Sequence, residues 1–141
     1  MKRFVRLVSA MLACALLLAV PAYAQEVSNR SSSYFSSYLA YCTKLSSTKV
    51  GVSFHVVGAG TMDEIGASQI KVQRSSDEKN WTTVKTFNKS DYSNMTDTDT
   101  ISHGSTLSCT VAAGYKYRAY ISFYAKNGTG TAYRYYYTDI I

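Results

Sequence analysis

Outside its first 24 residues, the sequence has no stretch in which apolar side chains recur with the helical period of 3.6 residues. It also has only two histidines, one tryptophan and three cysteines. A G-x-S-x-G motif and the twelve-residue calcium loop of EF-hand proteins are both missing. These absences argue against a helical domain, a serine hydrolase and an EF-hand protein. We therefore expect an all-β protein that is not an enzyme and binds no cofactor.

The first 24 residues have the pattern of a secretory signal peptide. Three basic residues open the segment, an apolar run of about 14 residues covers 7–20, and Ala22-Tyr23-Ala24 forms an A-x-A cleavage site. The apolar run is shorter than the roughly 20 residues that a membrane-spanning helix needs. We therefore expect cleavage after residue 24, no stable membrane insertion afterwards, and a secreted, extracellular protein.

The net charge is small once this segment is removed. The full chain has 15 basic and 9 acidic residues, and cleavage leaves 12 basic and 9 acidic ones, a net charge of +3. No basic stripe is present, so the sequence does not predict a nucleic-acid partner. The remaining 117 residues are enough for one domain with its own core, which we expect to be a monomer.

Short alternating segments separated by turn residues fill the rest of the chain. Residues 25–33 are polar and predict a flexible lead-in, and residues 34–141 predict one β-sandwich domain. Residues 61–68 are expected to be a connection, and the polar residues 88–104 are expected to be the longest loop. Seven antiparallel strands are predicted, at 34–43, 50–57, 69–75, 81–87, 106–111, 117–124 and 131–138.

The segment from Val111 to Gly130 has the clearest strand pattern. Tyr117, Ala119, Ile121 and Phe123 fall on one face, and residues 118, 120, 122 and 124 fall on the other. Glycines lie just before and just after the alternation. We expect the first face to point into the core.

Two cysteines, Cys42 and Cys109, remain after cleavage. In an oxidising extracellular compartment they are expected to form a disulfide bond. The alternative is a pair of buried free thiols. A catalytic cysteine is not expected, because neither residue has a basic neighbour in the sequence.

The titratable residues give no strong motif. His55 is expected to point outward from the second strand, and His103 is expected to lie in a loop; we interpret both as exposed polar residues. Asp97 and Asp99, with Asp91 nearby, could present carboxylates to calcium, but six or more oxygen ligands are needed and only two or three are visible. No metal site is predicted.

Tyrosine is the exceptional residue, with 13 in the chain, gathered mostly between Tyr115 and Tyr137. Such side chains combine a flat apolar ring with a polar tip, which suits stacking on sugars or anchoring a protein. For the last strand the sequence allows two registers, and the opposite one would expose Tyr133, Tyr135 and Tyr137 instead of residues 134 and 136. The predicted ligand-binding residues on the outer face are Arg118, Tyr120, Tyr124, Arg134 and Tyr136.

Part of the chain resembles fibronectin type III domains, which have an immunoglobulin-like fold. The residues that carry the resemblance are 111–120, with Tyr117 three residues after Gly114, the loop 126–130, and 70–75 followed by Asp77 and Trp81. The chain departs from the family in lacking a tryptophan on the second strand and in having the cysteine pair.

The resemblance has structural implications. Tyr117 would hydrogen-bond to nearby backbone as a tyrosine corner. The first, second and fifth predicted strands would form one sheet, and the third, sixth and seventh the other. Cys42 and Cys109 would then lie near the same end of the sandwich. The whole sequence also resembles small uncharacterised secreted proteins of Gram-positive bacteria, which implies export.

Two functions remain open from the sequence. The first is a non-catalytic binding module for an extracellular carbohydrate or protein partner, which would use the outer tyrosines or the loops. The alternative is a small antibacterial or cytolytic effector, whose positive charge and exposed aromatic side chains would help it adhere to anionic surfaces.

Overall fold

A computed structural model of the chain describes residues 33–141, so the predicted signal peptide and nearly all of the predicted lead-in lie outside the described residues. The described part contains six β-strands, all antiparallel to their neighbours, and one short 3-10 helix. In chain order they are β1 (Phe35–Ser46), β2 (Lys49–Ser75), β3 (Thr82–Asn88), η2 (Ser93–Met95), β4 (Thr96–Thr110), β5 (Lys116–Asn127) and β6 (Gly130–Tyr137).

Strand β2, with 27 residues, holds the other strands together. Along one edge its first half pairs with β1, and its second half pairs with β5. Along the other edge β4 pairs with residues 49–66, and β3 pairs with residues 69–74. Strand β6 then pairs with β5 on the side away from β2. Every strand therefore belongs to one continuous sheet.

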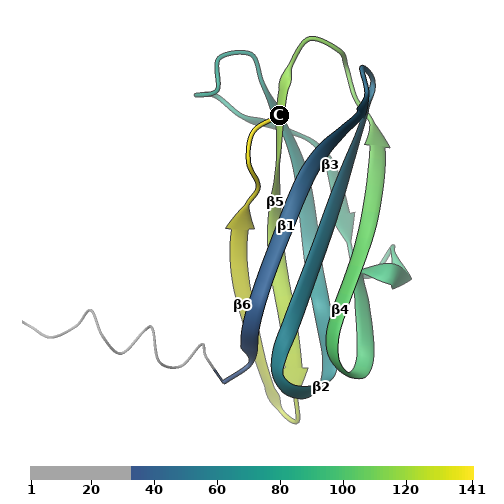
Figure 1. The fold of residues 1–141 in the computed structure, drawn as a ribbon, viewed down its shortest axis with the longest axis vertical. Coiled ribbons are helices and arrows are strands. Elements are labelled where there is room, and N and C mark those ends of the chain that lie inside the picture. The colour runs from purple at the N-terminus through teal and green to yellow at the C-terminus, as the bar shows by residue number, and fades with distance from the viewer. Residues whose placement is uncertain (1–32) are drawn as a thin grey trace, which may run out of the picture. The chain divides into compact units, whose positions relative to one another are not determined.

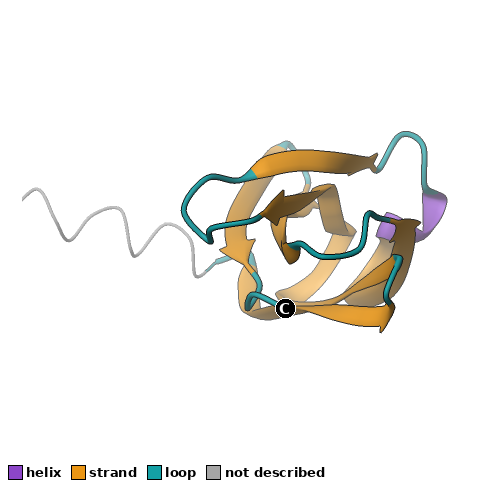
Figure 2. Cartoon of the chain, turned by 90° about the horizontal axis from the view of Figure 1, so that it is seen from above, coloured by secondary structure: helices purple, strands orange, loops and turns teal. Residues whose placement is uncertain are grey.

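The sheet folds back on itself where β2 bends. The register of the β2–β4 pairing shifts between Val57 and Met62, across Gly58-Ala59-Gly60, and β4 bends with β2 at the same level. Figure 1 shows β1, β4 and the first half of β2 in front, with β5 and β6 behind them. Seen from above, the sheet curls around its own interior (Figure 2). Long strands that bend in this way can line both sides of one core.

This architecture corrects the predicted sandwich of two separate sheets with seven strands. Residues 61–68, predicted as a connection, lie inside β2, and residues 96–104, predicted as part of a loop, belong to β4. Glycines at the bend interrupt the apolar alternation, although the backbone pairing continues past them. The neighbour relations implied by the family resemblance are nevertheless present: β1, early β2 and late β4 pair in that order, and late β2, β5 and β6 likewise.

The core lies between the two halves of the folded sheet. On β5 the predicted inward face is confirmed, since Tyr117, Ala119, Ile121 and Phe123 are all buried. The Phe123 ring lies 5.2 Å from the ring of Tyr38 on β1 and 6.3 Å from that of Phe54 on β2, measured between centroids. The other fully buried large side chains are those of Val50, Val52, Val56, Ile65, Ile70, Val72, Phe87 and Met95.

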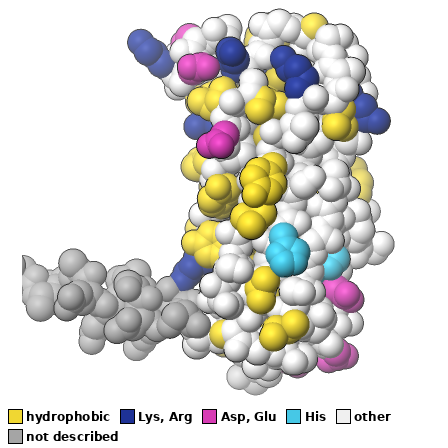
Figure 3. Space-filling model, in the orientation of Figure 1, with side chains coloured by type: hydrophobic (Ala, Val, Ile, Leu, Met, Phe, Trp, Pro, Cys, Tyr) yellow, Lys and Arg dark blue, Asp and Glu magenta, His cyan; other side chains and the backbone are white. Residues whose placement is uncertain are grey.

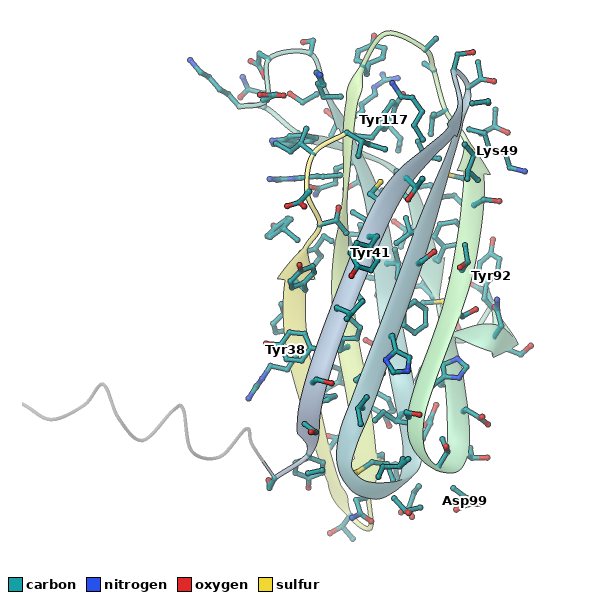
Figure 4. All side chains as sticks on the ribbon, viewed as in Figure 1. Tyr38, Tyr41, Lys49, Tyr92, Asp99 and Tyr117 are labelled. Carbon is teal, nitrogen blue, oxygen red and sulfur yellow. The ribbon has the colours of Figure 1, made fainter. Side chains whose placement is uncertain are left out.

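The hydrogen bond predicted for Tyr117 is confirmed. Its hydroxyl donates to the backbone carbonyl of Ala112, in the loop that leads into β5. The backbone of Tyr117 also exchanges two hydrogen bonds with Ile141, so the C-terminal residues extend the pairing of β5. Figure 4 shows Tyr117 at the upper end of the sheet, beside this C-terminal segment.

The predicted disulfide bond is not present, and Cys42 and Cys109 are free thiols. Cys42 lies opposite Val52, and Cys109 lies opposite Val50 on the other edge of β2. A whole strand therefore separates the two residues. Two strand spacings amount to about 9 Å, which exceeds the roughly 7 Å between Cα atoms that a disulfide can bridge.

We expect the buried Cys42 thiol to make the fold sensitive to alkali. Burial and the neighbouring Cys109 raise the pKa of Cys42 from 9.0 to about 11, against a lowering by its hydrogen bond with Thr138. From about pH 9 the unfolded chain loses this proton while the folded chain keeps it, so the free energy of unfolding falls as the pH rises. The expected loss between pH 8 and pH 11 is on the order of 1–2 kcal/mol.

Urea unfolding at pH 8 and pH 10.5 measures this loss. The Cys42→Ala variant should lose less stability over that range than the wild-type protein, whatever its stability at pH 8. Burial also raises the pKa values of Tyr117, Tyr120 and Tyr124, so some alkaline loss should remain in the variant. An identical loss in both proteins would show that Cys42 does not contribute.

Candidate functional site: the outer tyrosine face

The outer surface of β5 carries the side chains predicted there. Arg118 and Tyr120 alternate with the buried residues of the same strand and are half-buried on its opposite side, so their outward placement is confirmed. Tyr124 lies opposite Tyr133 on the same side but is only 6% exposed. It is covered by Lys89, whose Nζ lies 4.1 Å from the centre of its ring, and by the ring of Tyr133.

The two faces of strand β6 are exchanged relative to the prediction, which placed Arg134 and Tyr136 on the outer face as ligand-binding residues. Both side chains lie on the side that faces β1. The guanidinium of Arg134 is 5.9 Å from the centre of the Phe35 ring, and the ring of Tyr136 meets that of Tyr38 edge to face. Figure 4 shows Tyr38 where β1 approaches β6. The placement of these two residues on the outer face was therefore wrong.

Three tyrosines of β6 take their place on the outer surface. Tyr133, Tyr135 and Tyr137 are 44%, 61% and 52% exposed. Together with Tyr120 and Tyr124 they form what we call the outer tyrosine face. Successive tyrosines of β6 are two residues apart, which corresponds to about 6.8 Å along an extended strand.

Contacts between rings fix the arrangement of this face. Tyr120 lies directly opposite Tyr137, with 4.7 Å between ring centroids, and stacks almost parallel to Tyr135 at 5.9 Å. Tyr124 lies opposite Tyr133 at 5.4 Å. Aromatic pairs across strands stabilise a sheet by about 0.2–1 kcal/mol each. The pairs also hold the rings in one orientation, so little side-chain freedom is left to lose on binding.

At one end of the face an arginine packs against two aromatic rings. The guanidinium carbon of Arg118 lies 4.2 Å from the centre of the Trp81 ring and 4.4 Å from that of Tyr137. Its Nε donates to Oε1 of Gln73 at 2.9 Å. The end of the loop before β3 and the three strands β2, β5 and β6 therefore meet at this side chain.

The other end of the face carries an ion pair. Nζ of Lys89 lies 2.9 Å from Oε1 of Glu64. Burial raises the pKa of Glu64, but hydrogen bonds to Lys89 and Thr96 outweigh it and the pKa lies below its usual value. Burial lowers the pKa of Lys89, and Glu64 more than compensates, so that pKa is raised. Both groups are charged at neutral pH and neutralise each other.

The two histidines do not form a common site. His55 lies opposite Gly104 and is exposed on the outer side, as predicted. His103 lies in β4 rather than in a loop, on the inner side of the same sheet, where its ring packs against Phe54. Its Nε2 donates to the carbonyl oxygen of Asn94 at 2.7 Å. A shared proton relay between the histidines is therefore not formed.

The acidic residues considered for calcium are not gathered either. Within residues 33–141, no three His, Cys, Asp or Glu side chains are grouped closely enough to hold a metal ion. Asp97 accepts a hydrogen bond from the amide of Thr98, next to it in β4. Asp99, also in β4, lies at the lower end of the sheet in Figure 4.

A second exposed apolar area lies on the opposite side of the domain. Figure 3 shows hydrophobic side chains gathered over β1 on the face turned to the viewer. Leu39, Tyr41 and Leu45 are the exposed members on this strand. They lack the ring pairs and the held arginine of the outer tyrosine face.

Comparisons with known proteins add no relative. No protein-family model, no curated protein and no solved structure matches the chain. Within the described residues, no helix is long and apolar enough to cross a membrane.

Proposed function

We propose that the protein is a secreted, non-catalytic binding module that holds an extracellular polysaccharide on its outer tyrosine face. The single observation that carries the proposal is the row of three exposed tyrosines along β6, held by ring contacts with β5. Flat rings with polar tips suit the apolar faces and hydroxyl groups of sugars. A straight row of such rings matches an extended polymer better than a compact ligand.

The fold is part of the same proposal. A fibronectin type III-like arrangement is supported by the order in which the strands pair and by the hydrogen bond from Tyr117 to Ala112. Export is supported by the sequence of residues 1–24. A module of this kind presents a rigid sheet surface and needs no catalytic group.

The test is retention of the purified protein on insoluble polysaccharides and cell walls. Replacing Tyr133 and Tyr135 together by alanine should lower retention on one polysaccharide at least tenfold, since each ring contributes on the order of 1 kcal/mol by stacking. This variant keeps Tyr137, and therefore both rings around Arg118. The matched control is Tyr41→Ala, which removes an equally exposed tyrosine from β1.

The control should bind like the wild-type protein. Failure of the wild-type protein to bind any polysaccharide, or an equal loss in the control, would contradict the proposal. A dye-release assay with anionic vesicles separates the module from the alternative effector, because a binding module should leave the vesicles intact.

A further inference from the structure

The charges beside the outer tyrosine face are not balanced. In the part of the chain that the structure describes, the only ion pair joins Lys89 to Glu64. Arg118 and Lys71, which extend from adjacent strands on this side, have no acidic partner there. A ligand that covered these side chains would have to compensate their positive charge.

Arg118 has the geometry of a prepared anion-binding group. Its guanidinium carbon packs over the rings of both Trp81 and Tyr137, and its Nε donates to Gln73. Neither terminal nitrogen has a hydrogen-bond acceptor among residues 33–141. A planar guanidinium with free terminal nitrogens matches the two oxygens of a carboxylate.

Tyr137, one of the two rings that pack against Arg118, belongs to the outer tyrosine face on which a sugar would stack. Tyr137 contacts both the guanidinium and the ring of Tyr120, which in turn stacks on Tyr135. A sugar lying on these tyrosines would therefore bring its substituents next to Arg118. We propose that the ligand is an acidic polysaccharide, and that Arg118 binds the carboxylate of a uronic acid residue stacked on the neighbouring tyrosines.

This inference rests on the proposed function, and the probes are chosen to separate the two. Binding of polygalacturonate is compared with binding of the same polymer after full methyl esterification, which removes the negative charge and keeps the sugar rings. The wild-type protein should bind the acidic form at least tenfold more tightly. Because only the ligand is changed, this comparison does not depend on how any variant folds.

Variants of Arg118 and Lys49 test whether Arg118 causes the preference for the acidic polymer. Arg118→Gln should reduce the preference for the acidic form to less than threefold while still binding the esterified form. Arg118→Lys keeps the charge but has no planar fork, and it should lose most of the preference. Lys49→Gln, which removes one positive charge from the hairpin between β1 and β2, should leave the preference unchanged.

The inference would be overturned by equal binding of both polymers by the wild-type protein. An unchanged preference in Arg118→Gln or an equal loss of preference in Lys49→Gln would also overturn it. Equal binding that still depends on Tyr133 and Tyr135 would leave the proposed function standing. Absence of binding to either polymer would also overturn the inference, and retention on another polysaccharide would then decide the proposed function separately.

Discussion

Replacing Gly66 by alanine should destabilise the protein by about 3 kcal/mol or more, and most of the variant should fail to accumulate in folded form. Gly66 lies in β2 just after the bend, between its partners on β4 and β5. A Cβ atom there would lie 2.1 Å from the carbonyl oxygen of Met95 and 2.7 Å from the Cα of Thr96. Both are backbone atoms, so no rotation of a side chain can relieve the collision.

The consequences should extend beyond the point of contact. Met95 is fully buried in the core, and Thr96 begins β4. Displacing this segment would disturb the entry into the strand that covers most of one edge of β2. Native-state hydrogen exchange should therefore show the largest losses of protection in β4.

A matched glycine provides the control. Gly60 lies at the bend in the same strand, and a Cβ atom added there would have no heavy atom within 4 Å. Gly60→Ala should change the free energy of unfolding by less than about 1 kcal/mol. Equal stability of Gly66→Ala and Gly60→Ala would contradict the close contact between Gly66 and the backbone of Met95 and Thr96.

The second large effect is expected from Phe123→Ala, which should lower the free energy of unfolding by about 3–5 kcal/mol in urea titrations. Its ring is fully buried and contacts Tyr38 and Phe54 in the opposite half of the folded sheet. Truncating it would leave a cavity at the place where the two halves meet. Equilibrium unfolding should remain a single transition with an earlier midpoint.

Tyr135→Ala is the control for this prediction. Tyr135 is the most exposed tyrosine of β6, and it packs against Tyr120 rather than the core. Its removal should cost at most about 1 kcal/mol. Similar losses for Tyr135→Ala and Phe123→Ala would mean that the outer tyrosines are structural and would remove the basis of the proposed function.

The sequence predicted β5 well because one face of this strand is buried and the other is not. Tyr117, Ala119, Ile121 and Phe123 show this directly as alternation. It did not predict the continuity of β2, because Ile65, Gly66 and Ala67, just after the bend, are all buried and therefore show no alternation. Early β4 was missed because its segment TDTDT has no apolar residues, although threonine itself favours strands.

The register of β6 could not be predicted from its own residues. Tyrosine occurs at 133, 135, 136 and 137, so either face could be interpreted as the aromatic one. Phe35 and Tyr38 of β1 decide the register, because Arg134 and Tyr136 pack against them. The disulfide prediction failed for a similar reason, since only the pairing of β2 with both β1 and β4 shows that a strand lies between the cysteines.

The candidate site was therefore predicted only in part. Its β5 residues followed from alternation, whereas Trp81 and Lys89 come from distant segments that only the fold brings to the face. The two-residue spacing of Tyr133, Tyr135 and Tyr137 allowed the β6 row as one of two registers, but it did not select between them. The restraint of Arg118 by two rings depends on contacts between residues far apart in the chain.

The most direct test of the proposed function is a nuclear magnetic resonance titration of the protein with soluble oligosaccharides of the polysaccharide that retains it. We predict that the amide signals of residues 118–124 and 131–137, and the indole signal of Trp81, shift together and saturate. Signals from β1 and the first half of β2 should remain unchanged. Shifts confined to β1 and early β2, or no saturable shift in β5 and β6, would contradict binding at the outer tyrosine face.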